Sequence, residues 1–268
     1  MSILDEIVAN RRAEVSRQRA AGDPLRMARS AEASSGRTPH RFRKALQATE
    51  RVNIIAEFKR GSPSAGTINA TADPAERAMC YQRAGACAIS VLTEQRFFRG
   101  SLADLREVRA ATSLPILRKD FIVDEYQIDE AAVARADAVL LIVAVLSPKE
   151  LSRLRVRAET ELGMDALVEV HMREELDCAL ECGASLIGVN NRDLHTFHTS
   201  IDVSLELASL APAQAMMVSE SGISSGEQVR RLRQCGYSAF VIGEPLMRVT
   251  NPAPLIRDLQ NSNKTANA

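Results

Sequence analysis

The sequence predicts an α/β protein, a closed (β/α)8 barrel of the TIM-barrel type with an N-terminal helical extension. Eight apolar runs of strand length recur from residue 52 onward, and helical patterns with clear start signals lie between them. Polar residues follow most of these runs directly, as they do at the carboxyl ends of barrel strands. We therefore divide the 268 residues into an extension (1–50) packed on a barrel (51–260) and a polar C-terminal tail (261–268).

The extension begins with a capping pair, Ser2 and Asp5, and its sparse apolar stripe predicts a helix over residues 2–20. A break at Gly22-Asp23-Pro24 follows, and a second short helix is predicted from Phe42 to Leu46. The segment has too few apolar residues to form a core alone. We expect it to pack across the end of the barrel that carries the active site.

The predicted strands are Val52–Phe58, Ala86–Leu92, Leu114–Leu117, Ala138–Val143, Ala166–Val170, Leu186–Val189, Met216–Val218 and Ala239–Ile242. The alternative to a barrel is a doubly wound open sheet, which normally has about five or six parallel strands and a G-x-G-x-x-G motif after the first. The loop Gly61–Gly66 lacks that spacing and contains Pro63, which has no N–H group to offer a phosphate. The barrel is therefore favoured.

Local signals place the helices between the strands. Asp73-Pro74 and Ser147-Pro148 each supply an N-cap and a proline at the first helical position. The other predicted caps are Ser101, Asp124 and Ser224, the last with Glu227 three residues further on. Four glycines are predicted to end helices in the left-handed conformation: Gly85, Gly163, Gly183 and Gly236.

Charge and cysteine content exclude several classes of partner. Lys plus Arg and Asp plus Glu both total 34, so no overall field favours nucleic acid or an anionic membrane. The charged N-terminus lacks the apolar segment of a signal peptide, and no apolar run is long enough to span a membrane, which predicts a cytoplasmic protein. The 5 cysteines include no C-x-x-C pair, which indicates reduced thiols. We expect a monomer.

Two pairs of residues have metal-ligand spacing, Cys178 with Cys182 and His195 with His198, and neither pair has a third ligand near it in the sequence. We therefore predict no metal, and no motif predicts a cofactor. His171 follows Glu169 by two residues. We expect it to lie beside the site or in solvent, not to act as a second base.

The predicted active site consists of polar residues at the strand ends. They are Glu57 and Lys59 after the first strand, Lys119 after the third, Glu169 after the fifth, Asn190 and Arg192 after the sixth, and Glu220 after the seventh. Lys119 and Glu169 lie two strands apart on one rim, and we assign them as general acid and general base. Glu57 is expected to hold Lys119 charged and aimed.

Other residues are expected to bind the rest of the substrate. Phe98, Phe121 and Leu194 would form an apolar, partly aromatic wall that suits a flat ring. The loop Gly61–Gly66, in which Ser62 is assigned to substrate binding, has glycines at both ends and is expected to act as a lid. We expect the N-terminal extension to brace this loop.

Small residues after the seventh and eighth strands predict a phosphorylated small-molecule substrate. Ser221-Gly222 and Gly243-Glu244 offer backbone N–H groups where barrels commonly bind phosphate. The negative side chain of Glu244 would be unfavourable beside a phosphate, so we expect it to turn outward while its N–H group faces the anion.

Six motifs, spread over residues 50 to 250, resemble those of the indole-3-glycerol-phosphate synthase family. They are Ala56-Glu57-Phe58-Lys59-Arg60-x-Ser62-Pro63-Ser64, Leu92-Thr93-Glu94-x-x-Phe97-Phe98-x-Gly100-Ser101, Leu117-Arg118-Lys119-Asp120-Phe121, Leu167-Val168-Glu169-Val170-His171, Asn190-Asn191-Arg192-Asp193-Leu194 and Ser219-Glu220-Ser221-Gly222-Ile223.

The resemblance implies a carboxy-lyase of tryptophan biosynthesis, which would convert a carboxyphenylamino-deoxyribulose phosphate to indole-3-glycerol phosphate, carbon dioxide and water. It also implies that Lys119 is the general acid and Glu169 the general base. The polar residues that it implies around them are Glu57, Lys59, Asn190, Arg192, Glu220 and Ser221. Two other interpretations stay open. One is a Schiff-base aldolase, in which a rim lysine is the nucleophile. The other is a phosphate-binding barrel without catalysis.

Overall fold

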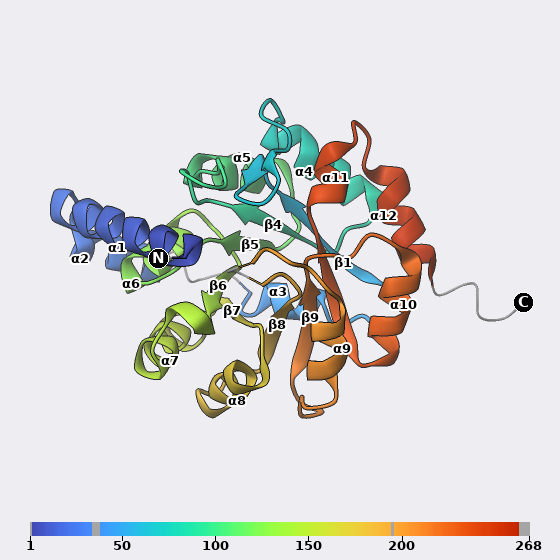
Figure 1. Cartoon of the computed structure of the whole chain (residues 1–268). Helices are drawn as coiled ribbons and strands as arrows, with labels where there is room; N and C mark the ends of the chain where they lie inside the picture. Colours follow the sequence, from blue (N-terminus) through green and yellow to red (C-terminus); the bar gives the residue numbers. More distant parts are fainter. Residues whose placement is uncertain (1, 34–37, 194–195, 263–268) are drawn as a thin grey trace, which may run out of the picture.

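The computed structural model describes residues 2–33, 38–193 and 196–262 and shows a closed barrel of eight parallel strands in the order β1-β10-β9-β8-β7-β6-β5-β4 (Figure 1). The strands are β1 Asn53–Phe58, β4 Ala88–Leu92, β5 Ile116–Lys119, β6 Ala138–Ile142, β7 Asp165–Val170, β8 Leu186–Asn190, β9 Met216–Glu220 and β10 Tyr237–Ile242. The predicted fold is therefore confirmed, and β2 (Gly61–Ser62) and β3 (Gly66–Thr67) form a small hairpin beside the barrel.

Three strands run further toward the active site than the sequence predicts. The apolar patterns end at Leu117, Val189 and Val218, whereas β5, β8 and β9 continue to Lys119, Asn190 and Glu220. The backbones of these polar residues stay in the barrel ladder, where Lys119 pairs with Leu92 and Glu220 pairs with Asn190. The side chains of Lys119, Asn190 and Glu220 therefore project from strand ends, not from loops.

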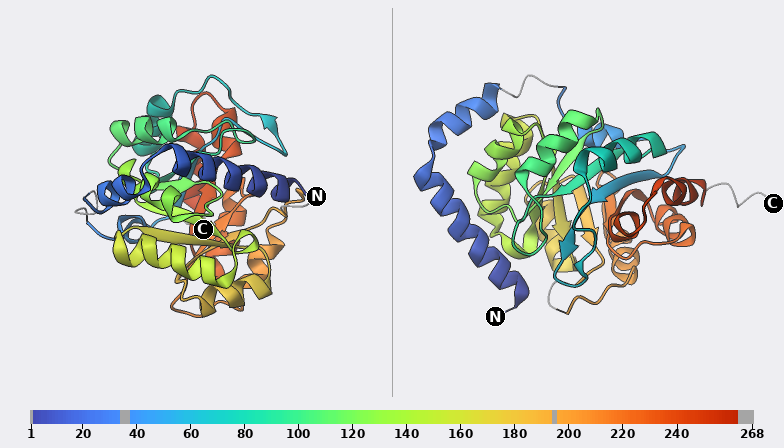
Figure 2. Two further views of the ribbon diagram at one scale, coloured as in Figure 1. Left: turned by 90° about the vertical axis from the view of Figure 1, so that its left-hand side faces the viewer. Right: turned by 90° about the horizontal axis from the view of Figure 1, so that it is seen from above.

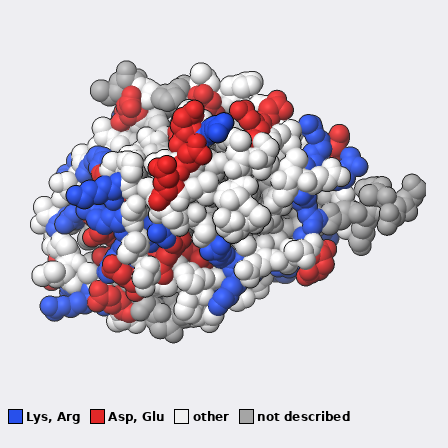
Figure 3. All heavy atoms as spheres, turned by 90° about the horizontal axis from the view of Figure 1, so that it is seen from below, with Lys and Arg blue, Asp and Glu red and all other residues white. Residues whose placement is uncertain are grey.

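Helices cover the outside of the barrel. They are α1 Ile3–Ala21, α2 Pro24–Ala33, α3 Arg41–Ala45, α4 Pro74–Ala84, α5 Leu102–Ala111, α6 Glu125–Val133, α7 Pro148–Val156, α8 Arg173–Glu181, α9 Asp202–Ala208, α10 Gly226–Gln234, α11 Glu244–Arg248 and α12 Ala253–Gln260. None of the helices in the described ranges is both long and apolar enough to cross a membrane. The face drawn in Figure 3 carries acidic and basic side chains together.

Most predicted helix caps are confirmed. The side chains of Asp73, Ser101, Asp124 and Ser147 each accept a backbone N–H bond at the start of their helix. The four predicted glycines all have a positive φ. The cap predicted at Ser224 with Glu227 is wrong. Ser225 caps α10, because Gln228 completes the capping box one residue later.

Helix α2 was not predicted from the sequence. We read Gly22-Asp23-Pro24 as a break, but Asp23 accepts the N–H of Arg26 at 3.0 Å and Pro24 is the first helical residue. This is the same Asp-Pro start signal that begins α4. The third helix, α3, lies one residue earlier than the predicted Phe42–Leu46.

The N-terminal helices run along the side of the barrel from one end to the other, and α1 lies against α6 (Figure 2). At the far end, α3 closes the amino end of the barrel. Phe42 and Leu46 are buried in the interior core, and Asn53 at the start of β1 donates to the carbonyl of Leu46 at 2.9 Å. Of the predicted tail, residues 261–268, only the first two lie within the described residues.

Candidate active site

A cavity of about 520 Å³ opens at the carboxyl ends of the strands. Its wall includes these sequence-predicted residues: Glu57, Lys59, Ser62, Phe98, Lys119, Phe121, Glu169, Asn190, Arg192, Glu220, Ser221, Gly222, Gly243 and Glu244. Leu194, also predicted, lies outside the described residues. The barrel therefore brings predicted residues from seven chain segments into one cavity.

Lys119 connects two buried carboxylates at the centre of this cavity. Its Nζ atom contacts the Glu220 carboxylate and lies 3.3 Å from Glu169 Oε2. Burial by itself lowers the pKa of Lys119, but the nearby charges of Glu220, Glu169 and Glu57 raise it more, so the net shift is upward. The amine is therefore held as an ammonium group and can donate a proton.

The prediction that Glu57 contacts Lys119 is wrong. Glu57 was expected to aim this lysine, but its Oε1 atom lies 2.6 Å from Nζ of Lys59, the neighbour two residues along the chain. Both side chains of that second pair are largely buried. Glu57 contributes to the charge around Lys119, and Glu220 makes the direct contact.

The two carboxylates that share Lys119 have opposite pKa shifts. For Glu169, burial raises the pKa, but Lys119, His171 and the amide of Asn190 lower it by a larger amount, so the net shift is downward. Asn190 donates to Glu169 Oε1 at 3.1 Å. For Glu220, burial raises the pKa to about 7, and the opposing charge of Lys119 does not compensate. The raised pKa therefore belongs to Glu220 and not to the assigned base, Glu169.

Two glycines make room for these carboxylates. A Cβ atom at Gly188 would lie 2.2 Å from Glu220 Oε1, and one at Gly243 would lie 2.2 Å from Glu57 Oε1. Gly188 was not singled out from the sequence, although a glycine inside an apolar strand often indicates the close approach of another group. Gly243 was predicted for phosphate alone, and its contact with Glu57 is a second constraint on that position.

The predicted phosphate side of the cavity has an unusual backbone. Ser221 and Gly222 have φ values of 66° and 74°, and α11 begins directly after Gly243. The Glu244 side chain pairs with Arg248 at 2.6 Å on the next turn of α11. Arg248 therefore balances the negative charge of Glu244 at the cavity wall, which both residues line.

The chain matches the family model described as indole-3-glycerol phosphate synthase over residues 4–259. It belongs to this family. It is 48% identical over 261 residues to the indole-3-glycerol phosphate synthase of Carboxydothermus hydrogenoformans, covering 96% of this chain and 98% of that protein. The Bordetella pertussis protein of the same name is 44% identical, with 93% and 95% covered. The crystal structure of KGPDC from Streptococcus mutans matches with a TM-score of 0.64 at 14% identity, over 81% of this chain and 99% of that one, which supports the barrel fold alone.

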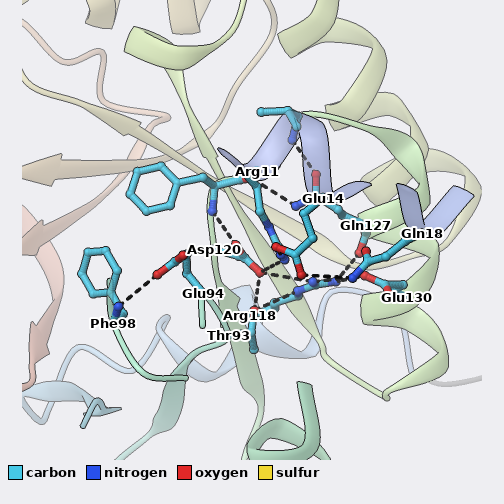
Figure 4. Close-up of polar contacts among 12 residues, drawn as sticks. Arg11, Glu14, Gln18, Thr93, Glu94, Phe98, Arg118, Asp120, Gln127 and Glu130 are labelled. Carbon is cyan, nitrogen blue, oxygen red and sulfur yellow. Dashed lines mark hydrogen bonds and ion pairs between the residues drawn. The ribbon is translucent and has the colours of Figure 1, made fainter. Parts of the chain in front are cut away.

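A buried network fixes the strand end that carries Lys119 in this family member (Figure 4). The next residue, Asp120, accepts bonds at Oδ2 from Arg11 at 2.6 Å, from Arg118 at 3.1 Å and from the Thr93 hydroxyl. Its Oδ1 atom accepts the N–H of Phe121 at 2.8 Å. Although burial raises the pKa of Asp120, the two arginines and these hydrogen bonds lower it overall. Asp120 therefore stays ionised and orients its two neighbours, Lys119 and Phe121, which both line the cavity.

The aromatic wall is positioned in a similar way. The Phe98 and Phe121 rings lie 5.9 Å apart at 43°. The buried Glu94 carboxylate accepts the N–H groups of Phe97 and Phe98 at 2.7 and 2.9 Å, which fixes the turn that carries Phe98 (Figure 4). The position of Phe98 therefore depends on a carboxylate that does not line the cavity.

Only the start of the extension reaches the rim, where Ile3, Leu4 and Ile7 of α1 line the cavity. Ion pairs within the described residues connect α1 to Arg96, Asp120, Asp124 and Glu150, which follow other strands. The Gly61–Gly66 loop contacts the sixth strand end, where Arg192 donates to Ser64 at 3.1 Å.

Two remaining sequence expectations concern histidine and metals. His171 lies beside the site, which is one of its two predicted positions, and its side chain is 11% exposed. In the described ranges, no three His, Cys, Asp or Glu side chains are grouped so that they could hold a metal ion. His195 lies outside those ranges.

Proposed function

We propose that this cavity carries out the indole-3-glycerol phosphate synthase reaction with Lys119 as the general acid and Glu169 as the general base. The chain is a carboxy-lyase of tryptophan biosynthesis, as its family membership over residues 4–259 establishes. The observation that carries the residue assignment is the position of Lys119. Its ammonium group lies between Glu169 and Glu220 in a cavity that also has an aromatic wall.

The reaction moves protons in both directions. Ring closure requires a proton on the ribulose carbonyl oxygen while the ring carbon that bears the carboxylate attacks. Loss of carbon dioxide leaves the new hydroxyl group, which departs as water after taking a second proton. A base then removes one proton from the carbon beside the nitrogen. Because a carboxylate leaves as neutral carbon dioxide, each turnover consumes one proton in total.

Lys119 meets the first demand, because its raised pKa keeps it protonated until the carbonyl oxygen develops negative charge. Glu169 meets the last, because its lowered pKa keeps it ionised and ready to accept a proton. Lys119 takes up a proton from solvent before the hydroxyl group leaves and donates it to that group, which accounts for the one proton consumed per turnover. Lys119 and Glu169 lie 3.3 Å apart, so the proton that Glu169 removes at the end can pass to Lys119 for the next turnover.

The remaining residues bind the parts of the substrate that do not react. Backbone N–H groups at Ser221, Gly222, Gly243 and Glu244 would hold the phosphate. Lys59 and Arg192 supply positive charge for the two anionic groups, and Phe98 with Phe121 would cover the anthranilate ring. Asn190 orients Glu169, Glu57 holds Lys59, and Ser62 lies on the lid side of the cavity.

The rival mechanisms are less consistent with this geometry. A Schiff-base aldolase needs a neutral amine, whereas the carboxylates around Lys119 raise its pKa. A barrel without catalysis would not need a lysine held between two buried carboxylates. We also propose that the protein acts as a monomer, since each of the assigned side chains in the cavity comes from the one chain.

The test is to incubate the protein with 1-(2-carboxyphenylamino)-1-deoxyribulose 5-phosphate and follow indole fluorescence. We expect product from the wild-type protein, and a loss of roughly 10²-fold or more in kcat for Glu169→Gln. Sodium borohydride added during turnover should leave no covalent adduct by mass spectrometry. An adduct on Lys119 would contradict acid catalysis, and a fully active Glu169→Gln protein would remove Glu169 as the base.

A further inference from the structure

We infer that His171, held by Glu175, is a positioning residue that orients the base Glu169 and keeps it ionised. The inference rests on the proposed role of Glu169. Neither His171 nor Glu175 lines the cavity, so the histidine approaches the carboxylate from behind, opposite the substrate.

Glu175 fixes the direction of the imidazole ring. The carboxylate, in the first turn of α8, accepts the backbone N–H of His171 at 2.7 Å and lies 3.1 Å from its Nδ1 atom. A carboxylate at this distance requires a proton on Nδ1. The ring therefore presents its other nitrogen, Nε2, on the far side from Glu175.

That other nitrogen faces the base. Nε2 lies 3.4 Å from Glu169 Oε1, the same oxygen that accepts from Asn190. Nε2 is buried, and no described residue is within hydrogen-bonding geometry of it. A small rotation of either side chain would complete a bond from Nε2–H to Glu169. Glu175, His171 and Glu169 thus form a chain in which one carboxylate orients an imidazole toward another.

A further cation near these carboxylates would add to the charge balance of the cavity, which Arg192 and Arg248 also line. Three buried carboxylates, those of Glu57, Glu169 and Glu220, face only two lysines, Lys59 and Lys119. Buried charges are stable only when they are paired, and an imidazolium at His171 would balance the third carboxylate.

The titratable groups that face His171 support the charged form. Burial lowers the pKa of His171, but Glu175, Glu169 and Glu220 raise it more, and the net shift is upward. The nearby cation Arg173 points elsewhere, since it pairs with Asp177 on α8. The imidazolium is thus present at low pH and is lost as the pH rises through its raised pKa. The positive charge beside Glu169 disappears in the same range.

The test compares His171→Gln and His171→Leu with the wild-type protein in kcat, KM and pH dependence. Both variants lose the charge, so the acidic limb of the kcat profile, where Glu169 becomes protonated, should move up by about one pH unit. Gln keeps an N–H donor near the position of Nε2 and should lose less activity than Leu, for which we expect roughly a tenfold loss in kcat. KM should stay unchanged, because His171 does not touch the cavity.

Glu175→Gln should produce a smaller shift of the same limb, and Glu174→Gln, its exposed neighbour on α8, is the matched control with no shift. A folded His171→Leu protein with the wild-type kcat and pH profile would overturn the inference. So would a loss of kcat that follows the melting temperature without moving the acidic limb. If Glu169→Gln itself remained active, the assigned base would be wrong, and that result would be distinct from either outcome for His171.

Discussion

At the amino end of the barrel, Phe42 and Leu46 fill the interior and α3 closes the opening, whereas at the carboxyl end α1 leaves a cavity between the strand ends. Both ends bury carboxylates. At the amino end, Asp165 accepts the N–H of Arg43 and pairs with His40, and Asp137 pairs with Arg41 and Arg109. At the carboxyl end, Glu169 and Glu220 share one lysine, and Glu220 Oε1 has no hydrogen-bond partner in the described part of the chain.

The difference shows that burial of a charge is a poor indicator of function. The amino-end carboxylates are saturated with donors, so they stabilise the fold and have no capacity left for a substrate. At the carboxyl end, Glu220 Oε1 has no partner among the described residues, which costs free energy of folding and leaves a proton acceptor available. Substitutions at the two ends should therefore separate activity from stability.

The largest effect is expected for Lys119→Ala. Loss of the general acid should lower kcat by roughly 10²- to 10⁴-fold, about 3 to 5 kcal/mol of transition-state stabilisation, with a much smaller change in KM. Steady-state kinetics by indole fluorescence measure both values, and Lys149→Ala, at an exposed position on α7, is the control. Activity within threefold of wild type would remove Lys119 from the mechanism.

Phe42→Ala should have the opposite signature. Its ring is fully buried at the closed end, so truncation should cost about 3 to 5 kcal/mol of unfolding free energy while kcat of the folded protein stays close to wild type. Urea denaturation and turnover at low temperature separate the two quantities. A folded variant with normal stability and low kcat would break the comparison.

Because Phe42 belongs to the interior core, a deletion of residues 1–45 would remove part of the barrel core and could not test the extension alone.

Arg11→Ala should affect both stability and activity, because Arg11 links α1 to the strand end that carries Lys119. Asp120 keeps Arg118 and Thr93, so we expect a loss of about 2 to 3 kcal/mol in stability, at the low end for a broken buried pair. KM should rise severalfold as Ile3, Leu4 and Ile7 shift. Arg12→Ala, one residue away in an exposed pair with Glu150, should change stability by less than about 0.5 kcal/mol. Equal effects of the two substitutions would contradict a special role for Arg11.

The smallest expected effect is the pH dependence of stability caused by Glu220. Its pKa of about 7 in the folded protein lies above that of an unfolded chain, so the folded state holds the proton more tightly. Stability should therefore fall as the pH rises from about 4.5 to 7 and remain lower above that range. Glu220→Gln should remove this slope in melting curves recorded at a series of pH values. An unchanged slope in the variant would assign it to another group.

The sequence by itself determined the barrel, most helix starts and the residues on the catalytic rim. These depend on local signals: apolar runs of strand length, capping side chains and polar residues that follow a strand directly. Because parallel strands end at one rim, order along the chain was enough to gather Glu57, Lys119, Glu169 and Glu220 in one cavity.

Only the tertiary structure decided which of these charges pair. Lys119 contacts Glu220, which lies 101 residues away in the sequence. Glu57, the predicted partner, pairs with Lys59 instead. Arg11 reaches Asp120 across 109 residues, and α3 closes the opposite end of the barrel. Such pairings depend on barrel closure, on the side-chain rotamers it permits and on the space left by Gly188 and Gly243. A local pattern contains none of these distances, because they exist only once the eight strands have closed into a barrel.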